Sequence, residues 1–274
     1  MRRLLLLLVA IVALGFVALP FWGAYRTPVV RRLSVGFPDW PAGAAPIRVA
    51  FASDLHLGNI DGRPGRTARV IAAINATRPD LVILGGDYVA DKGPGRAEDV
   101  AGALTAAVRG LRAPLGVVAV LGNHDHETNA AVVSRALRAG GAMLVVNGAI
   151  TRGPLSIGGI DDMVTGHGSE MVTRAAVQAL PGPRVMVSHA PNVIYGLPTD
   201  IRLVLAGHTH CGQVVLPLIG APWELSEPRY RCGIVPSGKG QTTIVSAGTG
   251  TSIVPVRFGA PPDIWLVTMG PARR

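Results

Sequence analysis

Asp, His and Asn residues recur in short polar clusters along the 274-residue chain, each directly after a run of apolar residues. Seven of them could ligate metal ions: Asp54, His56, Asp87, Asn123, His189, His208 and His210. Such a mixture of carboxylate, amide and imidazole groups suits two divalent cations about 3.5–4 Å apart that share a bridging carboxylate. The cations would hold a hydroxide ready to attack phosphorus and would neutralise the charge that develops on the phosphoryl oxygens.

The spacing within the clusters supports one shared site. Asp54 and His56 are two residues apart, so both side chains leave the end of a strand on the same side. His208 and His210 have the same separation, which lets one chain end serve both metals. Glycine directly precedes three candidates and allows the backbone to turn sharply off the strand, namely at Asp87, Asn123 and His208.

Each cluster taken alone has a simpler interpretation. Asp54 and His56 could be an ordinary pair of loop residues. Asn123 could be a turn residue after glycine, and His189 could be a buried histidine bonded to backbone. The two histidines of residues 207–210 also fit a structural zinc site. Five clusters in one order at successive strand ends favour the shared site. Two histidines fall outside it: we expect a surface residue at His126 and a loop residue at His167.

The elements that must position these residues follow a βαβαβα order. Apolar, β-branched runs predict strands at residues 47–52, 81–84 and 116–121, and helical patterns fall at residues 66–77, 97–110 and 129–139. This order predicts an α/β core with buried parallel strands. In such sheets ligands gather at the carboxyl ends of the strands, which is where the polar clusters stand.

Strands become more frequent in the second half of the chain. They are expected at residues 143–146, 155–160, 184–187, 203–205, 243–245 and 264–268, with one helix at residues 170–179. A second sheet packed on the first would account for this half. Residues 47–270 therefore form the predicted catalytic domain, and residues 26–46, rich in Pro and Arg, are predicted to be a linker.

The N-terminal residues 1–25 are expected to be a membrane anchor or a signal segment. Residues 4–25 carry no charge, and a span of about 20 apolar residues crosses a bilayer. Phe21, Trp22 and Tyr25 stand at the far end, where aromatic rings favour the membrane interface. The run is longer than the apolar part of a usual signal peptide, so a retained anchor is favoured over a cleaved signal, with a twin-arginine signal as the third option. We expect an exported catalytic domain.

Charge and cysteines leave partner and redox state open. The net charge is +9 and the isoelectric point is about 10.7, so nucleic acid is a candidate partner. No dense Lys/Arg run with interleaved aromatic residues occurs, which argues against it; an anionic substrate or acidic lipid headgroups suit the same charge. Cys211 and Cys232 could form a disulfide in an exported domain or remain two thiols.

The five clusters resemble the motifs of the calcineurin-like metallophosphoesterase superfamily: Asp54-Leu55-His56, Gly86-Asp87, Gly122-Asn123-His124-Asp125, His189 and Gly207-His208-Thr209-His210. The resemblance covers about residues 47–270 and implies a four-layer α/β/β/α sandwich. It implies that one metal is held by Asp54, His56, Asp87 and His210. Asp87 would bridge to the second metal, held also by Asn123, His189 and His208. His124 would not ligate but would stabilise the transition state or protonate the leaving oxygen.

A narrower resemblance is to a membrane-associated bacterial phosphodiesterase branch, which includes relatives of enzymes that cleave UDP-2,3-diacylglucosamine. Residues 158–162, 207–217 and 246–264 carry it. The sequence departs from the branch at Ala247, where an arginine is common, and Arg257 is the candidate replacement. Asp161 and Asp162 could be further ligands, although ordering of a loop is the simpler interpretation.

We therefore expect a membrane-anchored, metal-dependent phosphoesterase acting on phosphodiester or pyrophosphate bonds, with a lipid-linked substrate as one option. Its ligands suit Mn, Fe or Zn. The alternatives are a non-catalytic, membrane-tethered metal-binding module and a nuclease.

Overall fold

Two six-stranded mixed sheets pack face to face in the computed structural model, which describes residues 3, 15, 18–59, 64–91, 95–192, 197–237 and 240–272. In spatial order, the first sheet contains β1 (Val29–Phe37), β12 (Asp263–Pro271), β2 (Ile47–Ala52), β3 (Leu81–Leu84), β4 (Val117–Ala119) and β5 (Ala142–Leu144). The second contains β10 (Gly233–Ser237), β11 (Gln241–Val245), β9 (Ile201–Ala206), β8 (Arg184–Ser188), β7 (Leu155–Gly159) and β6 (Gly148–Arg152).

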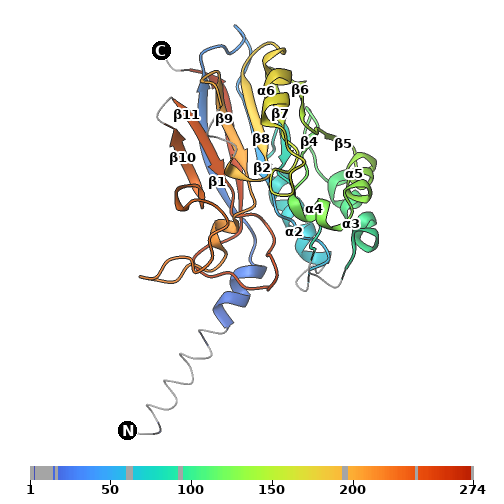
Figure 1. Ribbon diagram of the computed structural model, residues 1–274, viewed down its shortest axis with the longest axis vertical. Coiled ribbons are helices and arrows are strands. Elements are labelled where there is room, and N and C mark those ends of the chain that lie inside the picture. The colour runs from blue at the N-terminus through green and yellow to red at the C-terminus, as the bar shows by residue number, and fades with distance from the viewer. Residues whose placement is uncertain are drawn as a thin grey trace.

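Helices cover the outer face of each sheet (Figure 1). Against the first sheet lie α2 (Pro64–Ala76), α3 (Ala97–Arg109) and α5 (Ala130–Ala139), and against the second lies α6 (Glu170–Gln178). The layers therefore follow the order helix, sheet, sheet, helix. The predicted α/β fold with two packed sheets is confirmed.

The alternation of side chains along the strands builds this layering. In β2, Val49 and Phe51 enter the core between the sheets, whereas Ala50 and Ala52 face the helices. The small alanines leave room for the helix side chains, because successive residues of a strand point to opposite faces. From β2 to β5 the strands run parallel, so their carboxyl ends meet at one edge of the sheet.

The predicted linker at residues 26–46 is wrong for its central part. Residues 29–37 form β1, which pairs in parallel with β12 over nine residue pairs. Leu33, Val35 and Phe37 pack towards the core, while the residues between them are exposed. Apolar residues alternate with small or polar ones in the second half of this edge strand. The surrounding segment is rich in arginine and proline, so its overall composition predicts a linker and hides the alternation.

Most of the predicted membrane segment lies outside the described residues. Residues 18–25 are helical and precede β1. Among the residues that the structure describes, no helix combines the length and the apolar character needed to cross a bilayer.

Candidate metal centre

All seven predicted ligands lie at the edge where the carboxyl ends of strands from both sheets meet. Asp54 and His56 follow β2, and Asp87 follows β3. Asn123 begins α4 (Asn123–Thr128), directly after β4. The second sheet supplies the three remaining histidines, His189 after β8 and His208 and His210 after β9. The site therefore belongs to neither sheet alone and depends on how the two sheets are packed.

One cluster of ligands combines Asp54, His56 and His210. The Nε2 atoms of His56 and His210 are 3.1 Å apart, and Nε2 of His210 lies 3.5 Å from Oδ1 of Asp54. All three side chains are buried. Their ligand atoms lie within 4.8 Å of one another, a spacing that one cation could occupy.

A second cluster combines Asn123, His189 and His208. Nδ1 of His208 lies 3.0 Å from Oδ1 of Asn123 and 3.3 Å from Nε2 of His189. Nδ1 of His189 lies 2.8 Å from the carbonyl oxygen of Gly85, which fixes the orientation of this ring. Such a backbone contact on the far nitrogen is how metal-ligating histidines are commonly held.

The carboxylate of Asp87 stands between the two clusters. Its Oδ2 atom lies 3.1 Å from Nε2 of His189 in the second cluster and 3.7 Å from Nε2 of His56 in the first. Its other oxygen, Oδ1, accepts a hydrogen bond from the backbone N–H of His124 at 3.0 Å. A carboxylate shared by both clusters is the arrangement that a bridged pair of cations requires.

The backbone at the ligands is strained. Five of the predicted ligands have left-handed φ angles, at Asp54 (56°), His56 (48°), Asp87 (55°), His208 (70°) and His210 (50°). Non-glycine residues rarely adopt this region, and such conformations persist only where the surrounding structure enforces them. They turn the side chains off the strand ends and into the site.

Two glycines make the close approach of the ligands feasible. A Cβ atom on Gly122 would lie 2.2 Å from Oδ1 of Asp87, and one on Gly207 would lie 2.6 Å from Oδ2 of Asp54. Neither position tolerates a side chain while the carboxylates stay where they are. The glycines before Asn123 and His208 are therefore needed for space, in addition to the turn that the sequence predicted.

Burial keeps three of the histidines neutral. It lowers the pKa of His56 to about 3 and that of His208 to about 4. Burial, His56 and Arg257 together hold the pKa of His210 well below its ordinary value. A neutral imidazole is the form that binds metals, so these rings are ready to ligate at neutral pH.

The pair of His189 and Asp87 behaves differently. Burial disfavours the charged form of His189, but the adjacent Asp87 outweighs it and raises the pKa of His189 to about 10. Burial likewise opposes ionisation of Asp87, yet His189 holds the pKa of this carboxyl well below its usual range. A proton on His189 thus occupies the place that a cation would take, and a metal ion would have to displace it.

The donor set fits two divalent cations. Two carboxylates, an amide oxygen and four imidazoles converge within a buried region. Carboxylates and neutral imidazoles brought this close together in the protein interior are stabilised by a cation among them, because a buried charge requires a partner. Imidazole with carboxylate suits Mn, Fe or Zn, and geometry alone does not choose among them.

His124 lies beside the two clusters and is partly exposed. Its Nε2 atom is 3.8 Å from Oδ2 of Asp87, and its Nδ1 atom contacts the carboxylate of Asp91. The backbone N–H of Asp91 also lies 3.3 Å from Nδ1. This orients Nε2 of His124 towards the site. The sequence did not single out Asp91, which lies four residues after Asp87 and belongs to none of the five motifs.

Asp125 supports the site from behind and was also missed as a functional residue. Its carboxylate accepts backbone N–H hydrogen bonds from Asp87 (3.0 Å), Tyr88 (2.9 Å), Gly122 (2.9 Å) and Val89 (3.3 Å). The two loops that carry Asp87 and Asn123 are thereby tied together.

Asp161 and Asp162 order a loop, in agreement with the simpler interpretation. Oδ2 of Asp162 accepts hydrogen bonds from the N–H and the hydroxyl of Thr165, both at 2.6 Å. Asp161 lies 2.8 Å from Nε2 of His126, whose ring stacks on His167 with centroids 4.0 Å apart. His167 lies in an exposed loop, as predicted, and its ring stacks on that of the half-buried His126.

The turn that carries His208 and His210 is tied to a later segment. Cys211 forms a disulfide with Cys232, which settles the alternative that the sequence left open. In addition, the hydroxyl of Thr209 donates to the carbonyl oxygen of Arg231 at 2.7 Å. The ligand-bearing turn is therefore fixed to the loop that returns towards β10.

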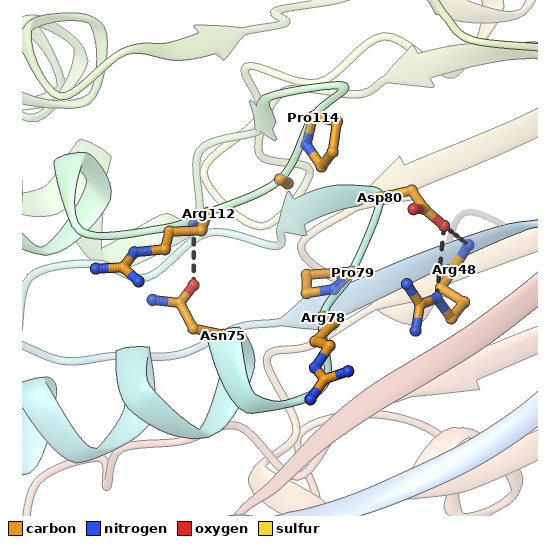
Figure 2. A pocket seen from close by; sticks show the side chains of 8 residues that line it. Arg48, Asn75, Arg78, Pro79, Asp80, Arg112 and Pro114 are labelled. Atoms are coloured by element: carbon orange, nitrogen blue, oxygen red, sulfur yellow. Dashed lines mark hydrogen bonds and ion pairs between the residues drawn. The ribbon is translucent and has the colours of Figure 1, made fainter.

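A cavity of about 650 Å³ lies at the opposite edge of the first sheet, where β2, β3 and β4 begin. Figure 2 shows its arginines: Arg48 pairs with Asp80, while Arg78 and Arg112 point in different directions. The guanidinium groups do not converge on a shared position. This cavity shares no residue with the metal centre.

Comparisons with known proteins agree with the site. Residues 47–212, more than half of the chain, match the model of the family described as calcineurin-like phosphoesterase. The chain is 26% identical over 255 residues to the phosphodiesterase YaeI of Escherichia coli, covering 88% of this chain and 87% of that protein. It is 27% identical over 264 residues to a Danio rerio protein named transmembrane protein with metallophosphoesterase domain, covering 90% of this chain.

The chain spans 55% and 58% of the lengths of its longer relatives from Caenorhabditis elegans and Danio rerio. Among solved structures, the 5'-nucleotidase precursor of Thermus thermophilus has a TM-score of 0.50 at 13% identity, covering 82% of this chain and 55% of the other. At this identity the likeness shows the fold alone. On the strength of the family match, the chain belongs to the calcineurin-like phosphoesterases and is a metal-dependent phosphoesterase.

Proposed function

We propose that this protein hydrolyses phosphodiester or pyrophosphate bonds with two divalent cations held at the edge between the sheets. The observation that carries the proposal is the position of Asp87 Oδ2, 3.1 Å from His189 and 3.7 Å from His56. A carboxylate that lies beside both clusters is the bridging ligand that a pair of cations requires.

The ligands divide between the two ions. Asp54, His56 and His210 would hold one cation, and Asn123, His189 and His208 the other, with Asp87 shared. When bound, the two cations would activate water for attack on phosphorus and neutralise charge on the phosphoryl oxygens. His208 and His124 line the accessible side of the site, where a phosphoester would enter.

His124 is proposed to act on the leaving group. Asp91 contacts Nδ1 of its ring and turns Nε2 towards the site, where Nε2 would carry the proton to be transferred. Transfer of this proton to the departing oxygen would let the bond to phosphorus break without forming a free alkoxide. The leaving group of the substrate would therefore lie next to Nε2 of His124.

We further propose that the enzyme acts at a membrane on a lipid-linked substrate. The uncharged residues 4–25 are long enough for a span of about 20 apolar residues. A relative carries the word transmembrane in its name. The net charge of +9 suits an anionic lipid surface or an anionic substrate.

The test is a hydrolysis assay on the full chain in detergent, loaded with Mn²⁺. A chromogenic phosphodiester and a panel of lipid pyrophosphates, including nucleotide-sugar lipids, would be compared. We expect metal-dependent turnover of both classes and preference for the lipid-linked members. His124→Ala should retain its metal and lose turnover.

Two results would overturn parts of the proposal. Absence of metal and of turnover, with His124→Ala indistinguishable from the parent, would exclude the catalytic part. Equal turnover of soluble and lipid-linked diesters would exclude the lipid preference alone.

A further inference from the structure

Most of the large apolar side chains exposed in the described part of the chain lie in three segments. They are helix residues 18–25, the loop after the ligand turn of β9, and the segment after β11. The exposed residues are Leu19, Phe21, Trp22, Leu218, Ile219, Trp223, Leu225, Ile253 and Val254. Leu218 is fully exposed, and Trp223 and Trp22 have 71% and 62% of their surface accessible. Soluble proteins rarely gather so many exposed apolar groups without a partner.

Hydrogen bonds join the three segments. The backbone N–H of Arg257 donates to the carbonyl oxygen of Pro20 at 2.8 Å, which ties helix 18–25 to the segment after β11. The side-chain amide of Gln213 donates to the carbonyl oxygens of Ser252 and Val254, which ties the loop to the same segment. Figure 1 shows all three at one end of the molecule. We call the nine exposed residues together the apolar end surface.

The apolar end surface adjoins the metal centre. Arg257, which bonds to helix 18–25 through its backbone, places Nη2 3.1 Å from Nδ1 of His210. Cys211, next to His210, is bonded to Cys232 at the end of the exposed loop. The surface and the ligand-bearing turn thus belong to the same end of the sandwich.

We propose that the apolar end surface rests on a lipid bilayer, with Trp223 and its neighbours inserted at the level of the headgroups. Residues 4–17, which precede helix 18–25 in the sequence, carry no charge, so the sequence adjoining this surface is apolar. The helix and the loop each carry a tryptophan. Tryptophan favours the membrane–water interface, because its ring is largely apolar while its indole N–H can bond to water or headgroups. The guanidinium of Arg26 lies 5.2 Å from the ring centroid of Trp22, so a bilayer contacted by Trp22 would bring anionic headgroups to this cation.

This contact adds a second attachment to the one expected from residues 4–25. An apolar N-terminal segment alone would attach the protein to the bilayer at a single point and would not set the tilt of the domain. Contact through the loop fixes its orientation and holds the metal centre beside the headgroups. The inference concerns binding and does not depend on the catalytic proposal.

The experiment uses the tryptophans of the full chain. The protein is reconstituted into vesicles of phosphatidylcholine and phosphatidylglycerol, with and without bromine on the phosphatidylcholine chains, and tryptophan emission is measured. Trp40 and Trp265 are buried, so Trp22→Phe leaves Trp223 as the exposed reporter. We expect brominated lipid to quench Trp22→Phe and expect the double variant Trp22→Phe/Trp223→Phe to lose this quenching.

A matched pair of substitutions tests the surface itself. In the Trp22→Phe background, Leu218→Asp with Ile219→Asp should lower the quenching, whereas Met171→Asp should not. Met171 is also exposed, at 67%, but lies on α6. Emission of Trp22→Phe that is insensitive to bromine would overturn the proposal. So would sedimentation in detergent as a dimer that Leu218→Asp dissociates, because a second copy would then cover the surface.

Turnover of a soluble phosphodiester, measured on the same preparations, separates the two proposals. An active enzyme without quenching would overturn the lipid contact alone. A quenched but inactive enzyme would overturn the catalytic proposal alone.

Discussion

Nη2 of Arg257 lies 3.1 Å from Nδ1 of His210, and the guanidinium also donates to the carbonyl oxygens of Ala247 and Gly250 at 2.6 Å. Arg257 is fully buried, and its side chain has only donors. The contact therefore sets the plane of the His210 ring, so that Nε2 faces Asp54 and His56. An arginine 47 positions away in the sequence thus positions a candidate metal ligand.

Arg257→Lys should weaken metal binding by about 10–100-fold, the usual effect of removing a group that orients a ligand. A lysine ammonium cannot reach the same carbonyls and His210 together. Titration of the metal-free protein with Mn²⁺ measures the change, and Arg184→Lys, far from the site on β8, is the matched control. Unchanged Mn²⁺ affinity in Arg257→Lys would show that His210 is held by other contacts.

His124→Gln should lower kcat by about 10²–10⁴-fold, the range for losing a general acid. Metal content should stay at the wild-type value, because His124 is not assigned as a ligand. Asp91→Asn should lower kcat less, since it removes only the group that orients the ring. Metal analysis alongside kinetics checks both, and loss of metal in His124→Gln would instead make this residue a ligand.

Asp125→Asn should lower the free energy of unfolding by about 1–3 kcal/mol, the cost of leaving buried polar groups unsatisfied. Asp125 accepts four backbone N–H groups, and an amide would turn its own NH₂ group towards some of these donors. Denaturant unfolding of the chelator-treated protein measures the loss. The exposed Asp39→Asn should leave stability unchanged, and an equal effect of both substitutions would contradict the prediction.

The stability of the metal-free protein should fall as pH rises. His189 has an ordinary pKa of 6.5 and a folded-state pKa of about 10, because the charge of Asp87 outweighs the effect of burial. A raised folded-state pKa contributes stability that is complete below pH 6.5 and is lost as pH approaches 10. Denaturant midpoints across this range, measured in chelator, should decline in the wild type and decline less in His189→Gln. Parallel slopes in the two proteins would contradict this account.

The strand ends and the candidate ligands that follow them could be predicted because local sequence encodes them. In β2, β3 and β4 a short apolar run stops at a glycine or polar residue, so both the strand and the ligand after it can be read from a few neighbouring residues. The two-residue spacing of Asp54 and His56 identifies their shared direction for the same reason. The order of the clusters along the chain then identifies the family.

The features that the sequence did not predict, or left open, depend on packing between distant segments. Composition predicts a linker where β1 lies, because the pairing partner of this strand, β12, lies more than two hundred residues later. Arg257 reaches His210 only when the segment after β11 folds back over the turn after β9. The disulfide between Cys211 and Cys232 had no local signal to decide it, whereas the three-dimensional arrangement brings their Cα atoms to 4.7 Å.

The most direct test of the central claim is electron paramagnetic resonance on the full chain loaded with Mn²⁺, combined with metal analysis. We predict two Mn²⁺ ions per chain with the spectrum of an exchange-coupled pair, since both clusters share the carboxylate of Asp87. Asp87→Asn should lose the coupling together with turnover. Magnetically isolated Mn²⁺ in the active wild type, or a coupled pair that survives in Asp87→Asn, would contradict the bridged centre.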